Sequence, residues 1–267
     1  MRIIETQLGC ATRRIGREGG SPCAALPRSG WLQAAGSCRL LLESDGKTMD
    51  DLTISAREYA YRLFAILLRE ELAAPTLGVL KDPDTFRRLS YFETAGSGAD
   101  GARAGYRAAL DEVREACSRI EDVEPVRDEY TRLFLGPNKL EAPPWESAYL
   151  GKGHVIMQPS TLEVRSCYLS EGLLPGGYPS VADDHVAIEL DFMARVSGKM
   201  LEAYDEGDGE ALERHLEAQR RFLKEHLLGW MPGYLAALEA ARRAEFYPAV
   251  VRLVYAFLRI DSLLIGA

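Results

Sequence analysis

The sequence DDHVAIELDFMARVSGKMLEAY, residues 183–204, decides the fold class. Its apolar residues recur every three or four positions, which is the period of an amphipathic α-helix. Leu190 and Met193 lie on the apolar stripe and are predicted to be core residues. Asp183 or Asp184 is expected to be the N-cap, because a short acidic side chain accepts hydrogen bonds from the free amides of a first turn. The segment therefore predicts one long, largely buried helix.

The same period continues on both sides of this segment, with recognisable helix starts. Ser55–Glu58 and Ser160–Glu163 are capping boxes, in which a hydroxyl and a carboxylate together satisfy free backbone amides. Asp82, followed by Pro83, predicts another start, and so does Asp208. Each of these signals opens a stretch whose apolar residues fall on one face.

Helix ends are marked by glycine and proline. Pro75 is expected to close the first helix, Gly136-Pro137 the fourth, and residues 230–232 to break the chain. The expected helices run from 55 to Pro75 and over about 82–92, 103–120, 123–135, 160–172, 183–204, 208–228, 234–241 and 246–265. Neither alternating strands nor an Asn-Gly hairpin signal appears. We therefore predict an all-α fold, a single bundle of about eight to ten helices.

Residues 1–48 differ from the rest of the chain. They are rich in Gly, Ser, Arg and Cys, show no sustained period, and carry a net charge of +3 against −11 for the remainder. The twin arginines at 13–14 suggest an export signal, but the residues that follow are glycine-rich and charged where such a signal is apolar. We expect a disordered or mis-annotated N-terminal extension, with translation beginning at Met49 and a helical domain over 49–267.

The composition excludes several classes of function. Apolar residues make up 47% and charged residues 27%, as in ordinary soluble proteins. The net charge of −8 opposes binding to nucleic acid, and no uncharged run reaches the roughly 18 apolar residues of a membrane span. The cysteines are odd in number and lack Cys-x-x-Cys spacing, which favours reduced thiols in the cytoplasm. They are Cys10, Cys23, Cys38, Cys117 and Cys167.

Three segments carry a further pattern. The first is EYTRLFLGP at 129–137, continued by APPWESAY at 142–149; the second is DHVAIELDFM at 184–193; the third is HLLGWMP at 226–232. In this order and spacing the chain resembles the TorD/DmsD family of redox-enzyme maturation chaperones. One departure is Val181-Ala182, where the family commonly has a Glu-Pro pair.

The resemblance implies a cytoplasmic chaperone without catalytic activity. Such chaperones bind the twin-arginine (Tat) signal peptide of the catalytic subunit of a molybdopterin-dependent oxidoreductase of the DMSO reductase class, or its folded body. They assist cofactor insertion and delay export. No cofactor is expected here; weak nucleotide binding is associated with the family, but no motif locates a site for it. The net charge and the lack of an apolar span predict no nucleic-acid partner and no stable membrane insertion, and the long loop at 136–159 allows either a monomer or a dimer formed by exchange of helices.

The chemistry of these segments fits a receptor for a cationic and partly apolar peptide. A guanidinium group pairs best with carboxylates, and an apolar helix face docks in a groove between helices. The expected peptide-binding residues are Leu133, Phe134, Trp145, Glu146, Tyr149, Asp183, Asp184, His185, Glu189 and Phe192. The remaining histidines, His154, His215 and His226, are expected to be surface or packing residues.

Other interpretations of these residues stay open at this point. Leu133 and Phe134 have the spacing of core residues, and Asp184 has the position of a simple helix cap. A metal-dependent hydrolase using Asp184, His185 and Glu189 is a rival function, although a zinc site usually takes three ligands in a recognisable pattern. A second rival is a family member that binds only the mature client and not its signal peptide.

Overall fold

The computed structural model describes residues 43–44, 47–95, 100–136, 140–150, 159–175 and 182–267. Most of the segment 1–48, for which a separate extension was expected, lies outside these residues. At its end, β1 (Glu43–Ser44) and β2 (Lys47–Thr48) pair in an antiparallel manner. Almost all of the secondary structure that follows is helical.

The described helices confirm the predicted all-α fold. In chain order they are α1 (Asp51–Arg69), α2 (Ala74–Lys81), α3 (Pro83–Leu89), the 3₁₀ turn η1 (Ser90–Glu93), α4 (Asp100–Arg119), α5 (Glu124–Tyr130), the π turn η2 (Thr131–Leu135), α6 (Ser147–Leu150), α7 (Pro159–Ser170), α8 (Val186–Glu206), α9 (Gly209–Phe222), the π turn η3 (Leu223–Leu227), α10 (Leu228–Ala240) and α11 (Phe246–Ile265). The chain passes from α9 through η3 into α10 without a break in helical structure.

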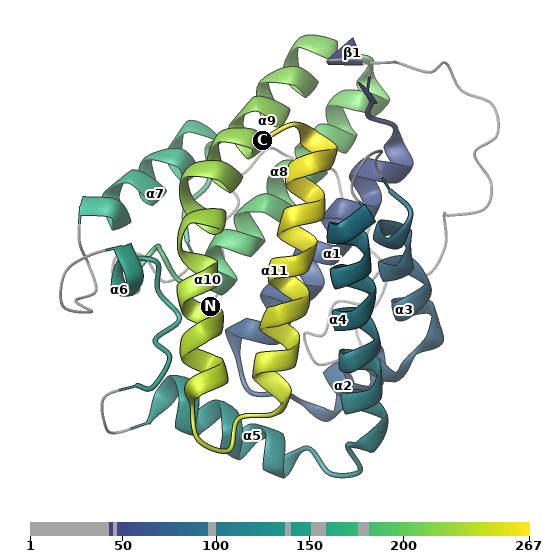
Figure 1. Ribbon diagram of the computed structural model, residues 1–267. Helices are drawn as coiled ribbons and strands as arrows, with labels where there is room; N and C mark the ends of the chain where they lie inside the picture. The colour runs from purple at the N-terminus through teal and green to yellow at the C-terminus, as the bar shows by residue number, and fades with distance from the viewer. Residues whose placement is uncertain (1–42, 45–46, 96–99, 137–139, 151–158, 176–181) are drawn as a thin grey trace, which may run out of the picture.

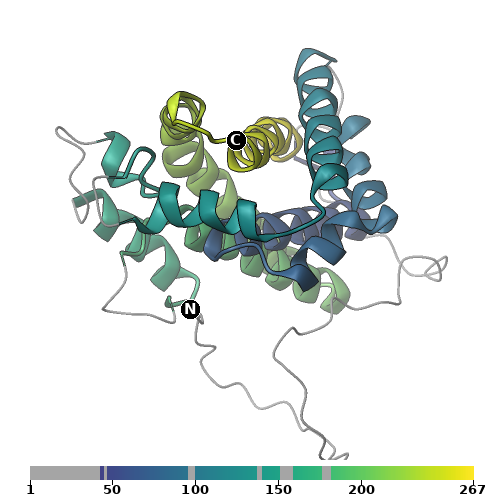
Figure 2. The ribbon, with the colours of Figure 1, turned by 90° about the horizontal axis from the view of Figure 1, so that it is seen from below.

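The long helices pack in two layers (Figures 1 and 2). Seen from below, α4, α10 and α11 lie on one side and α1 and α8 on the other, while α5 crosses the end of the bundle. Helix α11 packs between α4 and α10, and α1 packs along α8. The short helix α6 contacts α10, and α7 lies beside it at the edge of the bundle.

Most helix starts lie where the sequence predicts them. Asp82 and Asp208 cap α3 and α9, each accepting a hydrogen bond from a backbone N–H two or three residues further on. The first helix, however, begins earlier than the capping box at 55–58. Asp50 caps it by accepting a hydrogen bond from the N–H of Thr53 (2.8 Å). The expected start was therefore wrong, because a better acceptor stands one turn earlier.

Two prolines that were predicted to end or break helices lie inside helices, so these predictions were wrong. Helix α1 ends at Arg69, and Pro75 lies in the first turn of α2, where its missing N–H costs no hydrogen bond. Pro232 lies inside α10 and does not break the chain. The π turn η3 directly precedes α10. The π turn and Pro232 therefore both interrupt the regular backbone hydrogen bonds within one short stretch of a continuous helix.

A cluster of aromatic rings fills the centre of the bundle. Phe257 of α11 contacts Tyr61 and Phe92 edge-on, with centroids 4.8 Å apart in both pairs, and Phe64 at 5.4 Å. Burial of this apolar surface is the main force that holds the layers together. Within the described residues, none of the helices is long and apolar enough to traverse a lipid bilayer.

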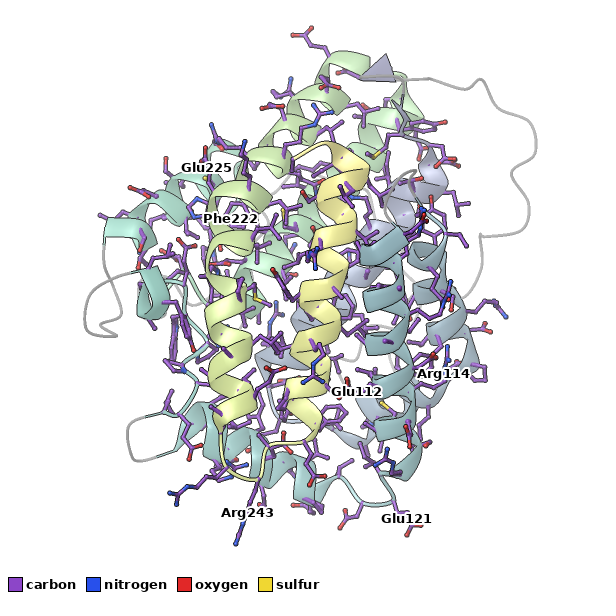
Figure 3. The ribbon with its side chains drawn as sticks, in the orientation of Figure 1. Glu112, Arg114, Glu121, Phe222, Glu225 and Arg243 are labelled. Atoms are coloured by element: carbon purple, nitrogen blue, oxygen red, sulfur yellow. The ribbon has the colours of Figure 1, made fainter. Side chains whose placement is uncertain are left out.

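Charged side chains cover the outside of the bundle (Figure 3). Arg252 of α11 forms ion pairs with Glu112 of α4 (2.5 Å) and Glu239 of α10 (2.6 Å). Glu121 and Arg243 project from the end of the bundle near α5. Exposed pairs of this kind contribute little to stability, so they do not decide the packing.

Glu129 fastens α5 to the start of α11. Its buried carboxylate accepts hydrogen bonds from the backbone N–H groups of Glu245, Phe246 and Tyr247, at 3.2, 3.3 and 2.9 Å. The first amides of a helix have no partner within the helix, and a carboxylate there also interacts favourably with the helix dipole. One side chain therefore fixes where the last helix begins.

Arg57 of α1 and Asp261 of α11 form a fully buried ion pair across the core. The guanidinium group donates from Nε and Nη2 to the two carboxylate oxygens (2.5 and 3.0 Å), and the hydroxyl of Tyr61 donates to Asp261 at 2.6 Å. Both charged side chains have no exposed surface. The carboxylate thus has three donors in place of water.

Replacing Asp261 with alanine should destabilise the protein strongly, because Arg57 would remain buried without its partner. We expect a loss of about 3–5 kcal/mol in the free energy of unfolding, measured by urea denaturation. The double variant R57M/D261L should lose less than D261A, since neither charge remains. Removal of the exposed Arg62–Glu58 pair by R62A is the control and should cost about 0.5 kcal/mol. Equal effects of D261A and R62A would contradict this account.

Candidate functional site

The loop before α6 meets the start of α8 in a short antiparallel bridge. Backbone hydrogen bonds of 3.0 and 2.9 Å join the residues on either side of Trp145 to those on either side of His185. The two rings contact each other edge-on, with centroids 5.5 Å apart and an angle of 81° between their planes. Both side chains are half-buried, so they form a small aromatic surface that we call the Trp145–His185 surface.

Pro143 and Pro144 prepare the loop for this pairing. Proline restricts its own backbone and favours an extended conformation in the residue before it. The carbonyl of Pro144 accepts the hydrogen bond from the N–H of Val186. The extended loop can therefore lie against the chain that enters α8.

Asp183 and Asp184 are buried at this junction, and their side chains form hydrogen bonds with α6 and α7. Asp184 is fully buried and accepts a hydrogen bond from the N–H of Ser147 at the start of α6 (2.9 Å). Asp183 accepts from Nε of Arg165 of α7 (2.5 Å), and burial raises its pKa although Arg165 acts in the opposite direction. Each carboxylate also has one oxygen, Oδ1, without a hydrogen-bond partner among the described residues. Buried acceptors without donors are uncommon.

His185 is the N-cap of α8, so the prediction that Asp183 or Asp184 caps this helix was wrong. Its Nδ1 accepts a hydrogen bond from the N–H of Ala187 (3.1 Å), while the two aspartates face other segments. A ring nitrogen that accepts a hydrogen bond carries no proton. Burial, and to a lesser extent the charge of Arg69, lower the pKa of His185 to about 4. The imidazole is therefore neutral near pH 7.

Glu146 and Glu189 form a second pair of carboxyl groups behind the bridge. Glu146 accepts a hydrogen bond from Nδ1 of His226 (3.0 Å), and Glu189 accepts one from Nε1 of Trp230 (3.1 Å). Complete burial, with the charge of Glu146 next to it, raises the pKa of Glu189 well above its usual range. The charge on Glu146 therefore disfavours a second charge on Glu189.

Tyr149 extends the site along α6 towards α10. Its ring stacks on Trp230, with centroids 5.6 Å apart and 24° between the planes, and lies edge-on to Tyr234 at 6.0 Å. A Cβ at Gly233 would come within 3.1 Å of the Tyr149 ring. A glycine on α10 thus permits the close approach of α6.

Three of the predicted binding residues lie in the core beneath the site. Leu133 has no exposed surface, and the ring of Phe134 contacts the ring of Tyr247, with centroids 5.2 Å apart. Phe192 packs against Phe222 at 4.6 Å. Their side chains support the helices that carry the Trp145–His185 surface. A direct contact of these three with a peptide stays a prediction.

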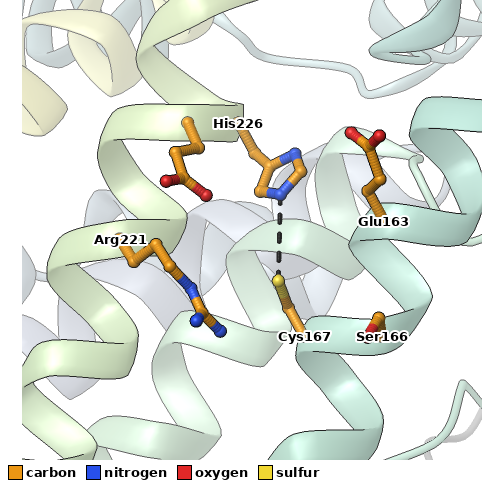
Figure 4. Close-up of a pocket in the computed structure, with 6 residues that line it drawn as sticks. Glu163, Ser166, Cys167, Arg221 and His226 are labelled. Atoms are coloured by element: carbon orange, nitrogen blue, oxygen red, sulfur yellow. Dashed lines mark hydrogen bonds between the residues drawn. The ribbon is translucent and has the colours of Figure 1, made fainter.

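A groove and a set of exposed leucines lie next to this network. The groove has a volume of about 640 Å³ and runs between α7 and the α9–η3 segment (Figure 4). On α6 and α7, Leu150, Leu162 and Leu169 are 51–60% exposed. Leu162 and Leu169 are seven residues apart and share one face of α7. This face is called the α7 leucine face below.

The geometry gives no support to a metal-dependent hydrolase. The side chains of Asp184, His185 and Glu189 are directed to Ser147, to the backbone of α8 and to Trp230, and they do not converge. In the part of the chain that the structure describes, no group of three or more His, Cys, Asp or Glu side chains is arranged to hold a metal ion.

Two residues of this network, His226 and Trp230, were not among the predicted site residues. His226, which was assigned to the surface or to packing, is buried and bridges Glu146 and Cys167. Trp230 contacts Glu189 and Tyr149. A signal was present, since His226 and Trp230 are four residues apart and therefore share a helix face. Their partners, however, come from segments 40 to 80 residues away.

These features define an all-helical protein with a buried carboxyl network, and comparison with known proteins assigns it to a class. The model of the family described as the nitrate reductase delta subunit matches residues 99–236, just over half of the chain. The chain therefore belongs to this family. The match confirms the resemblance to the TorD/DmsD chaperones for redox-enzyme maturation, since the curated relatives carry those names.

Three matches illustrate the relationship. The chaperone protein TorD of Photobacterium profundum is 29% identical over 134 residues, which are 50% of this chain and 61% of the relative. TorD of Vibrio atlanticus is 26% identical over 61% of this chain and 76% of its own length. A protein of Haemophilus influenzae described as the Tat proofreading chaperone DmsD is 30% identical over 48% of this chain and 56% of its own. All three are named as chaperones and not as enzymes.

One solved structure from Archaeoglobus fulgidus, described as a candidate redox enzyme maturation protein, was also matched. It has a TM-score of 0.44 and 18% sequence identity, and the match covers 76% of this chain and 93% of that chain.

The ionisation of His226 predicts a pH dependence of stability. Burial disfavours the imidazolium ion, but hydrogen bonds with Cys167 and Glu146 outweigh it and raise the pKa of His226 to about 9. The stabilisation is fully present below the unfolded-state pKa of about 6.5 and is lost as the pH rises towards 9. Over this window the loss should be on the order of 3 kcal/mol.

Urea denaturation at intervals between pH 6 and pH 9.5 measures this effect. The variant H226Q should lack the decline between pH 6.5 and 9, and E146Q should shift it to lower pH, because one of the groups that raise the pKa is gone. A decline of the same size in H226Q and in the unaltered protein would show that another group is responsible.

Proposed function

We propose that this protein is a cytoplasmic chaperone that binds the twin-arginine signal peptide of the catalytic subunit of a molybdopterin-dependent oxidoreductase. It would hold the signal while the cofactor is inserted and so delay export. The proposal takes its client from the names of the relatives and from the family resemblance. Its physical support comes from the acceptors and the apolar surface around the start of α8.

The observation that carries the proposal is the pair of free acceptors beneath the Trp145–His185 surface. Oδ1 of Asp183 and Oδ1 of Asp184 lie within two adjacent residues, are buried, and have no donor among the described residues. Buried carboxylate oxygens favour charge-assisted donors, and a guanidinium group offers several donors in one plane. The two neighbouring acceptor oxygens match two neighbouring arginines in number, although Asp183 is already ion-paired with Arg165.

The apolar part of a signal peptide needs a separate surface. The leucines of α6 and α7 supply one at the edge of the bundle, beside the segment that carries Trp145. A peptide whose arginines reach the aspartates would lay its apolar residues along the α7 leucine face, in the manner of a helix in a groove. Aromatic residues such as Trp145 are frequent anchors at such interfaces.

Because Asp183 and Asp184 are fully buried, the peptide would reach them only after a local movement at the surface. Trp145 and His185 lie at this junction and are half-buried, and only two backbone hydrogen bonds join the residues beside Trp145 to those beside His185. Loss of these two bonds would be compensated by hydrogen bonds to the arginines. The bridge would thus act as the entrance, while Glu146, Glu189 and the core residues beneath it keep their positions.

Substitution of Trp145 by alanine should weaken binding of a synthetic twin-arginine signal peptide about tenfold, mainly through faster dissociation. Calorimetry and surface binding kinetics with the full chain measure the two quantities. A peptide in which both arginines are replaced by lysines should bind more weakly to the unaltered protein, because lysine lacks the planar fork. Equal affinity for both peptides would overturn the assignment of Asp183 and Asp184 as acceptors.

Exposed leucines allow a test that leaves the core intact. The double variant L162S/L169S should lower the affinity for the signal peptide several-fold, because apolar area is lost from the interface. The matched control L52S/L263S removes two leucines of similar exposure, 44% and 42%, on α1 and α11 and should bind normally. Equal loss in both variants would contradict the α7 leucine face. Binding of the client body without its signal, and no binding of the signal, would support the rival scaffold function.

A further inference from the structure

Cys167, His226 and Glu146 form a connected chain of side chains from three segments. Nε2 of His226 in η3 lies 3.8 Å from Sγ of Cys167 in α7 (Figure 4). Nδ1 of the same ring lies 3.0 and 3.1 Å from the two carboxylate oxygens of Glu146. A thiol, an imidazole and a carboxylate in this order are the groups that activate a cysteine, with the carboxylate orienting the ring.

The carboxylate determines where the imidazole protons lie. Nδ1 carries a proton, because it faces the oxygens of Glu146, which act as acceptors. Nε2 is therefore the nitrogen that exchanges a proton with the sulfur. When this proton is on Nε2, the result is a thiolate next to an imidazolium ion, with the positive ring held between two negative groups. The raised pKa of His226 is in keeping with this arrangement.

Small molecules can reach the sulfur from outside. Cys167 is only partly buried and lines the 640 Å³ groove with Glu163, Ser166, Arg221, Glu225 and His226. Arg221 favours a negative sulfur and the two exposed glutamates oppose it. Glu146 lies behind the imidazole, and burial together with the charge of Glu146 raises the pKa of Glu189. His226, in direct contact with the sulfur, is the strongest of these influences because it is close and desolvated.

Cys117 of α4 is the natural contrast. It is almost completely buried among the apolar residues of the core, and burial raises the pKa of its thiol to about 11. A buried thiol of this kind is inert. The chain therefore contains a cysteine in a reactive setting and a cysteine in an unreactive one, which can be compared within one sample.

We propose that Cys167 is a modification site, a thiolate paired with His226 that is oxidised by small peroxides. The sulfur attacks one oxygen of hydrogen peroxide and the O–O bond breaks. The leaving hydroxide takes the Nε2 proton of His226 and departs as water. Cysteine is oxidised by two electrons to a sulfenic acid, and the peroxide is reduced. The thiolate and the imidazolium ion become a neutral sulfenic acid and a neutral imidazole.

Alkylation by iodoacetamide across pH 5–9.5, followed by mass spectrometry of peptides, tests the thiolate in the full chain. Only the thiolate reacts, and an ordinary thiol is half ionised near pH 8.5. At pH 6.5 alkylation of Cys167 should be about tenfold faster than that of free cysteine, while Cys117 should stay unmodified under the same conditions. In H226Q the rate for Cys167 should fall to about that of free cysteine. A rate equal to that of free cysteine in the unaltered protein would overturn the proposal without reference to any variant.

Oxidation is measured separately by treating the protein with hydrogen peroxide and trapping sulfenic acid with dimedone. The label should appear on Cys167 and not on Cys117, and H226Q should reduce it about tenfold at pH 6.5, where few unassisted thiols are ionised. The far-UV circular dichroism of each variant checks that it is folded. Labelling of Cys167 that is absent, or that is the same with and without His226, would refute the assigned role of the imidazole.

Discussion

A carboxyl group that is removed from water needs donors or a proton, and this constraint organises the protein. Asp261 is surrounded by Arg57 and Tyr61, and Glu129 by three backbone amides at the start of α11. Both join helices that are more than 100 residues apart in sequence. Because an unpaired buried charge is so costly, each carboxylate accepts only one arrangement of its neighbours. The apolar core supplies most of the stability, and these groups determine which helix ends lie together.

The same constraint shapes the surface around the start of α8. Glu146, Asp183, Asp184 and Glu189 come from two segments, and each accepts a hydrogen bond from a different kind of donor: an imidazole, a guanidinium group, a backbone amide and an indole N–H, respectively. Their positions hold the loop of Trp145 against His185. A peptide receptor in this family would therefore be rigid beneath its entrance and adaptable at it. Oδ1 of Asp183, Oδ1 of Asp184 and Oε1 of Glu189 have no hydrogen-bond partner among the described residues, and buried groups of this kind concentrate at functional sites.

His226 connects this surface with the groove that exposes Cys167. One ring nitrogen contacts the carboxylate next to Trp145, and the other faces the thiol. The two sites therefore share a titratable group. Under the proposed oxidation of Cys167, the contact of His226 with the sulfur would change, and the same ring contacts Glu146 next to the loop before α6. A chaperone for redox enzymes would in this way carry a redox-reactive group within its own structure.

The sequence by itself determined the all-α fold, the ends of most helices, and the two segments that form the candidate site. Helical period, caps such as Asp82 and Asp208, and the Gly136 stop are local properties, and local interactions are sufficient to specify them. The tertiary structure decided that His185 and not an aspartate caps α8, that Pro232 stays inside a helix, and that Glu146 meets His226. Such pairings join residues far apart in sequence, and burial selects their partners only when the helices pack.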